Sequence, residues 1–364
     1  MEKIFTEDDL IYIQNRGNSI EKIQQQLDFF IQGIPKINLV RSAKVGDGIW
    51  QFSEEETNDF VIYFDKHKTN YSIEKFVPAS GAATRMFKFL NEFLNDFDVE
   101  NDTINSYINK RNAKDISIFI FGLKNFPFYR ELKEKTIQLY PNYYSLSSDA
   151  KYHALIKTLL SKEGLDFANK PKGILPFHVR DEKIITPIEE NIFESDFFKK
   201  ENQKTKIHFT ITEEFQPDFE KITNQFSECE ISFSYQNQST DTLAVNEDNT
   251  PFRIEDDKLF FRPGGHGALI ENLNALNSDI IFIKNIDNVS QNHKKVIEIN
   301  KKLLGGVLLL MQYKIFNYLK LLSSGSVTEA QITEIKDFAE NKTSFPLPEE
   351  FNFFQTEYKV EYLI

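Results

Sequence analysis

The apolar and polar positions of this chain follow two different periods. Up to about residue 70, apolar residues recur at helical spacing, as Ile20, Ile23 and Leu27 do, and residues 100–165 repeat that pattern. Beyond residue 200, short apolar runs alternate with helical stretches instead. This change of period predicts a helical N-terminal segment over residues 1–70 and a helical insertion at about residues 100–165.

Alternating strands and helices dominate the second half of the chain. We expect strands over residues 207–211, 231–235 and 279–283, in addition to an earlier β-prone run that ends at Pro78. Such alternation is typical of an α/β fold with a mainly parallel sheet flanked by helices. The fold class that we predict is therefore α/β, with a Rossmann-like sheet.

The same pattern predicts how the chain is divided. We expect an α/β core over residues 71–300 and a helical C-terminal extension, packed on that core, over residues 301–364. The most apolar part of the extension, residues 305–322, is interrupted by polar side chains such as Lys314 and Lys320. A membrane span needs about 20 mostly apolar residues, so we interpret this segment as a buried helix.

Three loops of small or polar residues follow predicted strands. They are residues 80–85, residues 263–267 after an expected strand at 260–262, and residues 285–288. The carboxyl ends of parallel strands lie at one edge of a sheet, and ligands bind in the crevice there. We therefore expect these three loops to contribute to a single site.

The first loop has the composition of a phosphate site. Ser80, Gly81 and Ala82 are small enough for backbone N–H groups to approach an anion, and a helix is expected to begin directly after them. Arg85 would add a full charge and a planar set of donors, and we expect Thr84 to be a nucleotide-binding residue as well. The alternative is a tight strand-to-helix turn with Thr84 as the N-cap. The loop is neither a Walker A motif nor a dinucleotide fingerprint.

The second loop is rich in glycine. Gly264, Gly265 and Gly267 surround His266, and three glycines in four positions cost backbone entropy. A base or sugar lying against the backbone would explain them. The alternative is a tight loop in which His266 caps the following helix.

The third loop offers a carboxylate. Asp287, two residues after Asn285, follows a strand, where a carboxylate is well placed to hold Mg²⁺ together with phosphate oxygens. The alternative is an Asx-type turn. Lys172 lies between a proline and a glycine on a stiff turn and would pair with a phosphate, unless it is an ordinary solvated lysine.

Composition narrows the classes of function. The chain has 43 basic and 55 acidic residues, a net charge of −12, which argues against broad nucleic-acid binding. The single Cys229 cannot form an internal disulfide, and the N-terminus lacks the apolar region of a signal peptide. We expect a cytoplasmic protein with no nucleic-acid or membrane partner. The oligomeric state is left open.

Taken in order, these motifs resemble the UDP-sugar pyrophosphorylases, nucleotidyltransferases of the glycosyltransferase-A-like fold. The matching elements are a Gly-x-x-Thr-Arg-Met loop at 81–86, Pro-Lys-Gly at 171–173, strands that end in threonine at 207–212 and in glutamine at 233–236, Pro-x-Gly-x-Gly at 263–267 and Asn-x-Asp-Asn at 285–288. Within that superfamily the chain most resembles an uncharacterised bacterial family described only as a domain of unknown function. The long segment between the first two elements implies a helical insertion.

The resemblance implies a reaction in which a sugar 1-phosphate attacks the α-phosphorus of a nucleoside triphosphate and pyrophosphate leaves. Arg85 would hold the β- and γ-phosphates, and Lys172 would stabilise charge on the α-phosphate. Asp287 would bind Mg²⁺, the glycine loop would lie against the base or ribose, and Gln236 would contact the base edge. Two alternatives stay open on the same fold: a non-catalytic module that binds or senses a nucleotide or phosphosugar, and a glycosyltransferase.

Overall fold

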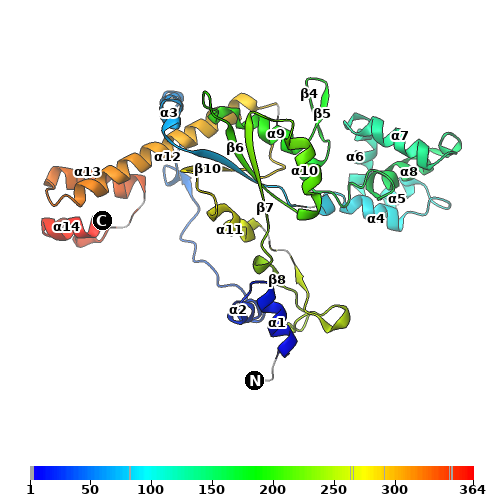
Figure 1. Cartoon of the computed structure of the whole chain (residues 1–364), viewed down its shortest axis with the longest axis horizontal. Helices are drawn as coiled ribbons and strands as arrows, with labels where there is room; N and C mark the ends of the chain where they lie inside the picture. Colours follow the sequence, from blue (N-terminus) through cyan, green and yellow to red (C-terminus); the bar gives the residue numbers. More distant parts are fainter. Residues whose placement is uncertain are drawn as a thin grey trace. The chain divides into compact units, whose positions relative to one another are not determined.

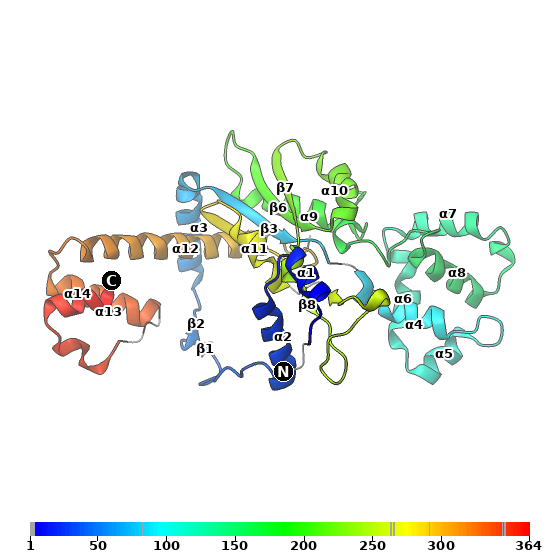
Figure 2. The ribbon, with the colours of Figure 1, turned by 60° about the horizontal axis from the view of Figure 1, so that its bottom comes forward.

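The computed structural model describes residues 4–81, 83–262, 264, 266–290, 292–343, 345 and 347–364. The chain divides into two compact units, one comprising residues 1–44 and 71–294 and the other residues 45–70 and 295–364. Figures 1 and 2 show the elements of both units from two directions. The predicted helical N-terminal segment is thus shared between the units, and the packing of residues 301–364 on the core stays a prediction.

A four-stranded parallel sheet forms the centre of the first unit (Figure 1). Its strands, in spatial order, are β10 (Ile280–Ile283), β3 (Ile73–Pro78), β6 (Thr205–Ile211) and β7 (Cys229–Tyr235). All three pairings are parallel. The prediction of an α/β fold with a parallel sheet flanked by helices is therefore confirmed.

The order of the strands in space differs from their order along the chain. β3 comes first in the sequence but lies inside the sheet; β6 and β7 continue from it on one side, and β10 lies on the other. The strand order therefore reverses between β3 and β10. At such a reversal the connections leave the sheet in opposite directions and open a crevice beside the carboxyl ends of the two strands.

One face of the sheet is apolar and is covered by α9 (Pro187–Glu194) and α10 (Gln216–Thr223). The buried side chains that meet there come from alternate strand positions and from both helices: Val77, Ala79, Ile188, Ile192, Ile207, Phe209, Ile211 and Phe219. This face also buries Lys75, whose Nζ donates to the Asn191 carbonyl at 2.7 Å and pairs with Glu194 at 3.1 Å. A buried charge needs such partners because leaving water is costly.

On β6 and β7, the positions between these apolar residues are polar and lie on the other face of the sheet. The imidazole of His208 is buried, and its two ring nitrogens lie 2.7 Å from the hydroxyl oxygens of Ser232 and Ser234. Its ring stacks on Phe76 with centroids 5.7 Å apart. Burial lowers the pKa of His208 below its ordinary value of 6.5, and the carboxylate of Glu74 opposes this shift.

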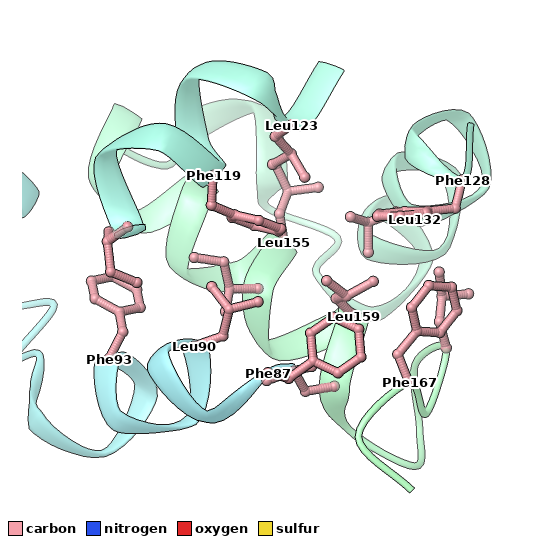
Figure 3. Close-up of a cluster of buried hydrophobic side chains, with 14 of the residues drawn as sticks. Phe87, Leu90, Phe93, Phe119, Leu123, Phe128, Leu132, Leu155, Leu159 and Phe167 are labelled. Carbon is pink, nitrogen blue, oxygen red and sulfur yellow. The ribbon is translucent and has the colours of Figure 1, made fainter. Parts of the chain in front are cut away.

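The connection from β3 to β6 contains the expected helical insertion. Its helices are α4 (Lys88–Asp96), α5 (Ile104–Arg111), α6 (Lys114–Gly122), α7 (Tyr129–Leu139) and α8 (Ser148–Leu160). They surround one hydrophobic core, part of which is shown in Figure 3, with labelled residues Phe87, Leu90, Phe93, Phe119, Leu123, Phe128, Leu132, Leu155, Leu159 and Phe167. The same connection ends with an antiparallel hairpin, β4 (His178–Arg180) and β5 (Lys183–Ile185), before α9.

A second small core joins the N-terminus to the connection between β7 and β10. α1 (Glu7–Asn15) and α2 (Ile20–Gln32) pack against β8 (Thr242–Leu243) and β9 (Phe261–Arg262). α11 (Ile270–Asn274) follows before β10. The prediction that residues 260–262 form a strand is right, but this strand pairs antiparallel with β8 and not with the main sheet.

The second unit is mainly helical. Its elements are the hairpin β1 (Lys44–Val45) and β2 (Gly48–Ile49), which begins at the boundary residue, and α3 (Glu54–His67), α12 (Lys294–Leu322), α13 (Glu329–Lys342) and α14 (Thr356–Leu363). α12 and α3 cross closely at Gly306, where a Cβ would lie 2.1 Å from the Phe60 carbonyl oxygen. No helix in the described part of the chain combines the length and apolar content that crossing a membrane requires.

Gly164 provides a test of packing in the helical insertion. A Cβ at this position would lie 1.8 Å from the carbonyl oxygen of Thr158, which accepts a hydrogen bond from the Leu165 N–H at 2.8 Å. We expect Gly164→Ala to lower the free energy of unfolding by about 1–3 kcal/mol, because backbone must move. Gly122→Ala is the matched control, since that Cβ meets nothing within 4 Å. Equal stability of the two variants in urea unfolding would contradict the packing described.

His208 predicts a pH dependence of stability. Because its folded pKa is lowered, the unfolded chain binds the proton first as the pH falls through about 6.5, so stability is lost below that pH and not above it. The loss from this one group is at most about 1.4 kcal/mol per pH unit. We expect His208→Gln to flatten the urea-unfolding profile between about pH 7.5 and 5.5. The exposed His293→Gln should leave that profile as it is in the wild type.

Candidate ligand-binding site

The candidate site lies at the carboxyl ends of β3 and β10, where the strand order reverses. Backbone hydrogen bonds extend the strands at this edge: the Lys284 N–H donates to the Phe76 carbonyl at 3.0 Å, and the Ala79 N–H donates to the Thr210 carbonyl at 2.8 Å. The loops that begin at Ser80 and Asn285 therefore leave the sheet side by side. Sequence analysis predicted both loops at this edge.

A third segment, residues 170–173, is bound to the first of these loops. The Lys172 N–H donates to the Gly81 carbonyl at 3.1 Å, and the Ala83 N–H donates to the Lys170 carbonyl at 3.4 Å. Gly173 is buried, and a Cβ there would lie 3.4 Å from the Ile286 side chain, which belongs to the loop after β10. The segment thus fits between the two loops, although it follows the whole helical insertion.

This packing brings two of the predicted catalytic residues into direct contact. The Nζ of Lys172 lies 2.5 Å from Oδ2 of Asp287, across 115 residues of sequence. The side chains are 26% and 50% exposed, so both remain accessible from solvent. An ion pair this exposed contributes at most about 1 kcal/mol to stability. An anion could take the place of the carboxylate, and a cation that of the ammonium, at little cost.

The loop after β3 differs from its predicted form. Ser80 is half-buried, while Gly81, Thr84 and Arg85 are exposed. Arg85 ends a short 3₁₀ turn, Ala83–Arg85, and α4 begins only at Lys88, with no side-chain N-cap bond. Thr84 is therefore not the N-cap of α4, and Arg85 is not in its first turn.

Packing explains this difference. Ala83 is fully buried in the core of the helical insertion, which fixes the backbone of the turn before α4 can begin. Around Gly81, in contrast, a Cβ would meet nothing within 4 Å, so this part of the loop has open space beside it. Ala82, one of the predicted binding residues, lies outside the described residues.

Gln236 and Gly264 lie together beside the carboxyl end of β7, away from the loops that follow β3 and β10. The Gln236 Nε2 donates to the Gly264 carbonyl at 3.5 Å and to Oδ1 of Asp241 at 3.4 Å. A Cβ on Gly264 would lie 2.8 Å from the Thr240 carbonyl oxygen, so close approach within the chain itself requires this glycine. This contact supports the alternative interpretation of Gly264, in which the glycine is needed for a tight loop and not for a ligand.

The rest of the glycine loop is only partly described. Gly265 lies outside the described residues, and for His266 only the backbone is described, at the start of the 3₁₀ turn His266–Leu269. Gly267 is exposed, with nothing within 4 Å of its Cβ position. Because β9 lies outside the parallel sheet, this loop does not leave a carboxyl end of that sheet, contrary to the prediction.

The loop after β10 is a tight turn. The Asn288 N–H donates to the Asn285 carbonyl at 3.2 Å, and the Asn191 Nδ2 donates to the Ile286 carbonyl at 3.4 Å. A buried Ile286 anchors the turn and leaves Asp287 half-exposed beside it. The hydrogen bond that closes this turn is a backbone bond and not the side-chain bond of the predicted Asx-type turn, and the turn presents the carboxylate that was expected to hold a metal.

The two groups of candidate residues occupy different positions along the edge. Asp287 follows β10 and Gln236 follows β7, and these are the two outer strands of the sheet. The two strands lie three strand spacings apart, about 14 Å across the sheet. A ligand that contacts both groups must therefore extend along the sheet edge, with one end beside Lys172 and the other beside Gln236.

Sequence analysis missed two side chains near this edge. Asn272 of α11 donates through Nδ2 to Oγ of Ser234 and to the Tyr235 carbonyl, each at 2.8 Å, and so attaches α11 to the end of β7. Thr210 is fully buried at the end of β6, and no described residue makes a hydrogen bond with its hydroxyl. A polar residue within an apolar strand was the available signal for Thr210; nothing local marked Asn272.

Comparisons with known proteins identify the family. No curated protein matches the chain, and no solved structure matches it. A family model described as "Domain of unknown function (DUF4301)" matches residues 6–364. This confirms the prediction of an uncharacterised family, while the relation to UDP-sugar pyrophosphorylases stays a prediction. Because the match covers nearly the whole sequence, the chain belongs to the DUF4301 family.

Proposed function

We propose that the crevice between β3 and β10 binds the phosphates of a nucleotide, and that the protein is a Mg²⁺-dependent nucleotidyltransferase of the sugar-phosphate pyrophosphorylase type. The observation that carries this proposal is the contact between Lys172 and Asp287 beside the open loop at Gly81. An accessible ammonium, an accessible carboxylate and free space for an anion meet at the strand reversal, the usual position of a ligand in a Rossmann-like sheet.

In the proposed reaction an oxygen of a sugar 1-phosphate attacks the α-phosphorus of a nucleoside triphosphate. The bond from the α-phosphorus to the oxygen that bridges to the β-phosphate breaks, and pyrophosphate leaves with that oxygen. Such chemistry depends on positioning and on charge stabilisation more than on a protein nucleophile. Cations placed around the phosphates are therefore the main requirement.

The residues of the crevice suit these tasks. Lys172 would leave Asp287 and stabilise charge on the α-phosphate, and the exposed Arg85 would reach the outer phosphates. Asp287 would hold the metal, with phosphate oxygens and water as its other ligands, since the described residues contain no group of three or more His, Cys, Asp or Glu that would hold one alone. When bound, Mg²⁺ would neutralise charge on the phosphates.

A non-catalytic module that binds or senses a nucleotide or phosphosugar is the second candidate. The described phosphate loop has one glycine, Gly81, and Ala83 is buried in the helical core. Both features limit how many backbone N–H groups can surround a triphosphate. Lys172 and Asp287 also satisfy each other without a ligand. Both observations are compatible with binding without turnover.

We expect nucleoside triphosphates with Mg²⁺ to raise the melting temperature, and a sugar 1-phosphate then to release pyrophosphate. Asp287→Asn should abolish the Mg²⁺-dependent part of both signals, and Lys172→Met should weaken nucleotide binding about tenfold or more, because each removes one charge of the crevice. Differential scanning fluorimetry and a pyrophosphate assay measure these effects. Lys88→Met, which removes an exposed ion pair with Glu92 on α4, is the matched control.

The outcomes separate the candidates. Stabilisation by nucleotide without pyrophosphate release favours the sensor, and hydrolysis of a sugar nucleotide without pyrophosphate favours a glycosyltransferase. If no nucleotide stabilises the protein, or if Asp287→Asn and Lys172→Met bind as the wild type does, the crevice is not a nucleotide site.

A further inference from the structure

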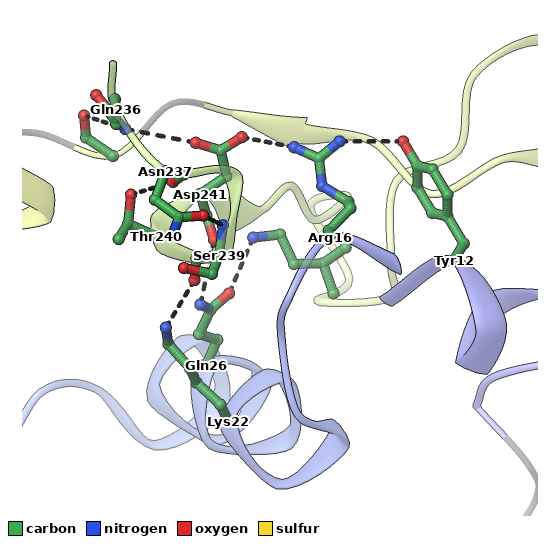
Figure 4. A network of polar contacts seen from close by, with 11 residues as sticks. Tyr12, Arg16, Lys22, Gln26, Gln236, Asn237, Ser239, Thr240 and Asp241 are labelled. Carbon is green, nitrogen blue, oxygen red and sulfur yellow. Dashed lines mark hydrogen bonds and ion pairs between the residues drawn. The ribbon is translucent and has the colours of Figure 1, made fainter. Parts of the chain in front are cut away.

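The N-terminal helices are attached to the glycine-loop side of the sheet edge by a dense polar network, shown in Figure 4. Arg16, directly after α1, pairs through Nη2 with Oδ2 of Asp241 at 2.6 Å and donates through Nη1 to the Tyr12 hydroxyl at 3.3 Å. Lys22 of α2 donates to the Ser239 carbonyl at 2.7 Å. The side chains of Arg16 and Asp241 are only 15% and 11% exposed, so this ion pair is largely shielded from water.

The network continues to the residue that sequence analysis expected to contact the base. Asp241 uses Oδ2 for Arg16 and Oδ1 for the Nε2 of Gln236. The second partner of that Nε2 is the Gly264 carbonyl, which is also an acceptor. Two acceptors fix the orientation of the amide, because a flipped amide would place oxygen against oxygen. Gln236 Oε1 then has no hydrogen-bond partner among the described residues and is available to a donor.

The interface between the N-terminal helices and this loop also contains buried polar atoms without a protein partner. The Nε of Arg16 and both polar side-chain atoms of Asn18, in the turn between α1 and α2, are buried and have no hydrogen-bond partner in the part of the chain that the structure describes. A buried polar atom without a partner costs folding free energy, and native interfaces usually avoid it. Arg16 also lies over the rings of Phe261 and Tyr12, 4.8 Å and 5.6 Å from their centroids, so the same side chain both stabilises the attachment of α1 and orients Asp241.

We infer that Arg16 is a positioning residue for base recognition. It holds Asp241, Asp241 holds the Gln236 amide, and Gln236 presents Oε1 as a hydrogen-bond acceptor to an N–H of the base. The N-terminal helical pair thereby becomes part of the nucleotide site. This inference rests on the proposed function, since it concerns the base end of the same ligand, beside β7 on the opposite side of the sheet from β10.

The test compares ligands that do and do not have a base. Isothermal titration calorimetry on the full chain measures affinities for the four common ribonucleoside 5′-monophosphates and for ribose 5-phosphate. We expect Arg16→Gln to weaken the best nucleoside monophosphate about tenfold and to leave ribose 5-phosphate unchanged, because only the base contact depends on Gln236. Asp241→Asn, which weakens the same ion pair, should act in the same direction.

Lys22→Gln is the matched control. It removes a hydrogen bond from α2 to the same loop without touching Asp241, so it should leave the ratio of the two affinities as it is in the wild type. A structural role alone would change both ligands equally or only the melting temperature. Circular dichroism establishes that each variant is folded, and Arg16→Lys replaces Arg16→Gln if the latter does not fold.

Two results would overturn the inference. One is a wild type that binds a nucleoside monophosphate no better than ribose 5-phosphate; the other is an unchanged affinity ratio in the folded Arg16 and Asp241 variants. If neither the nucleoside monophosphates nor the triphosphates bind the wild type, the proposed function itself fails and the inference fails with it. A changed ratio in the Arg16 and Asp241 variants but not in Lys22→Gln supports it.

Discussion

Parallel strands cannot be joined by tight turns, and this constraint determines the arrangement of the first unit. Every connection must run back along the sheet before the next strand begins. The connection from β3 to β6 therefore has room for the helical insertion, the Lys172 turn and α9, and the connection from β7 to β10 contains β8, β9 and α11. Because all four strands end at one edge, segments that are far apart in sequence meet there. The contact between Lys172 and Asp287 is a consequence of this topology and of the strand order, not of local sequence.

The sequence predicted the sheet strands well, because burial on one face imposes a period that is visible without a structure. Ile207, Phe209 and Ile211 face α9 and α10, and the intervening His208 and Thr210 occupy the other face. Strand pairing was harder to predict. Phe261 and Arg262 form the expected strand, but their partners are β8 and the N-terminal core, and an apolar run has the same appearance whichever strand it pairs with. Residues 301–364 were expected to be helical, and α12, α13 and α14 confirm this.

The site shows a similar division between local and long-range information. Glycines and small residues identified the loops, but not why each glycine is there. Gly264 is needed because its backbone approaches Thr240 closely, whereas Gly81 borders open space, and only coordinates separate these reasons. The start of α4 was predicted too early in the sequence. The residues of the loop do not indicate that Ala83 is buried against the helical insertion. The pairing of Arg16 with Asp241 joins residues 225 apart in sequence, and no local pattern indicates it.

The overall charge gives the Lys172–Asp287 contact its physical meaning for a phosphate ligand. A chain with a net charge of −12 repels a free nucleoside triphosphate at long range, so any such ligand must be attracted by local charges within about 8 Å, the screening length in physiological salt. Lys172 and Arg85 provide those cations, but Lys172 is neutralised while it contacts Asp287. Under the proposed function, a ligand that brings a divalent cation would resolve this conflict, because Asp287 would hold the cation and Lys172 would then be available to the phosphate. The proposed function therefore links the binding of a metal to the binding of a phosphate, through two opposite charges held in one accessible pair.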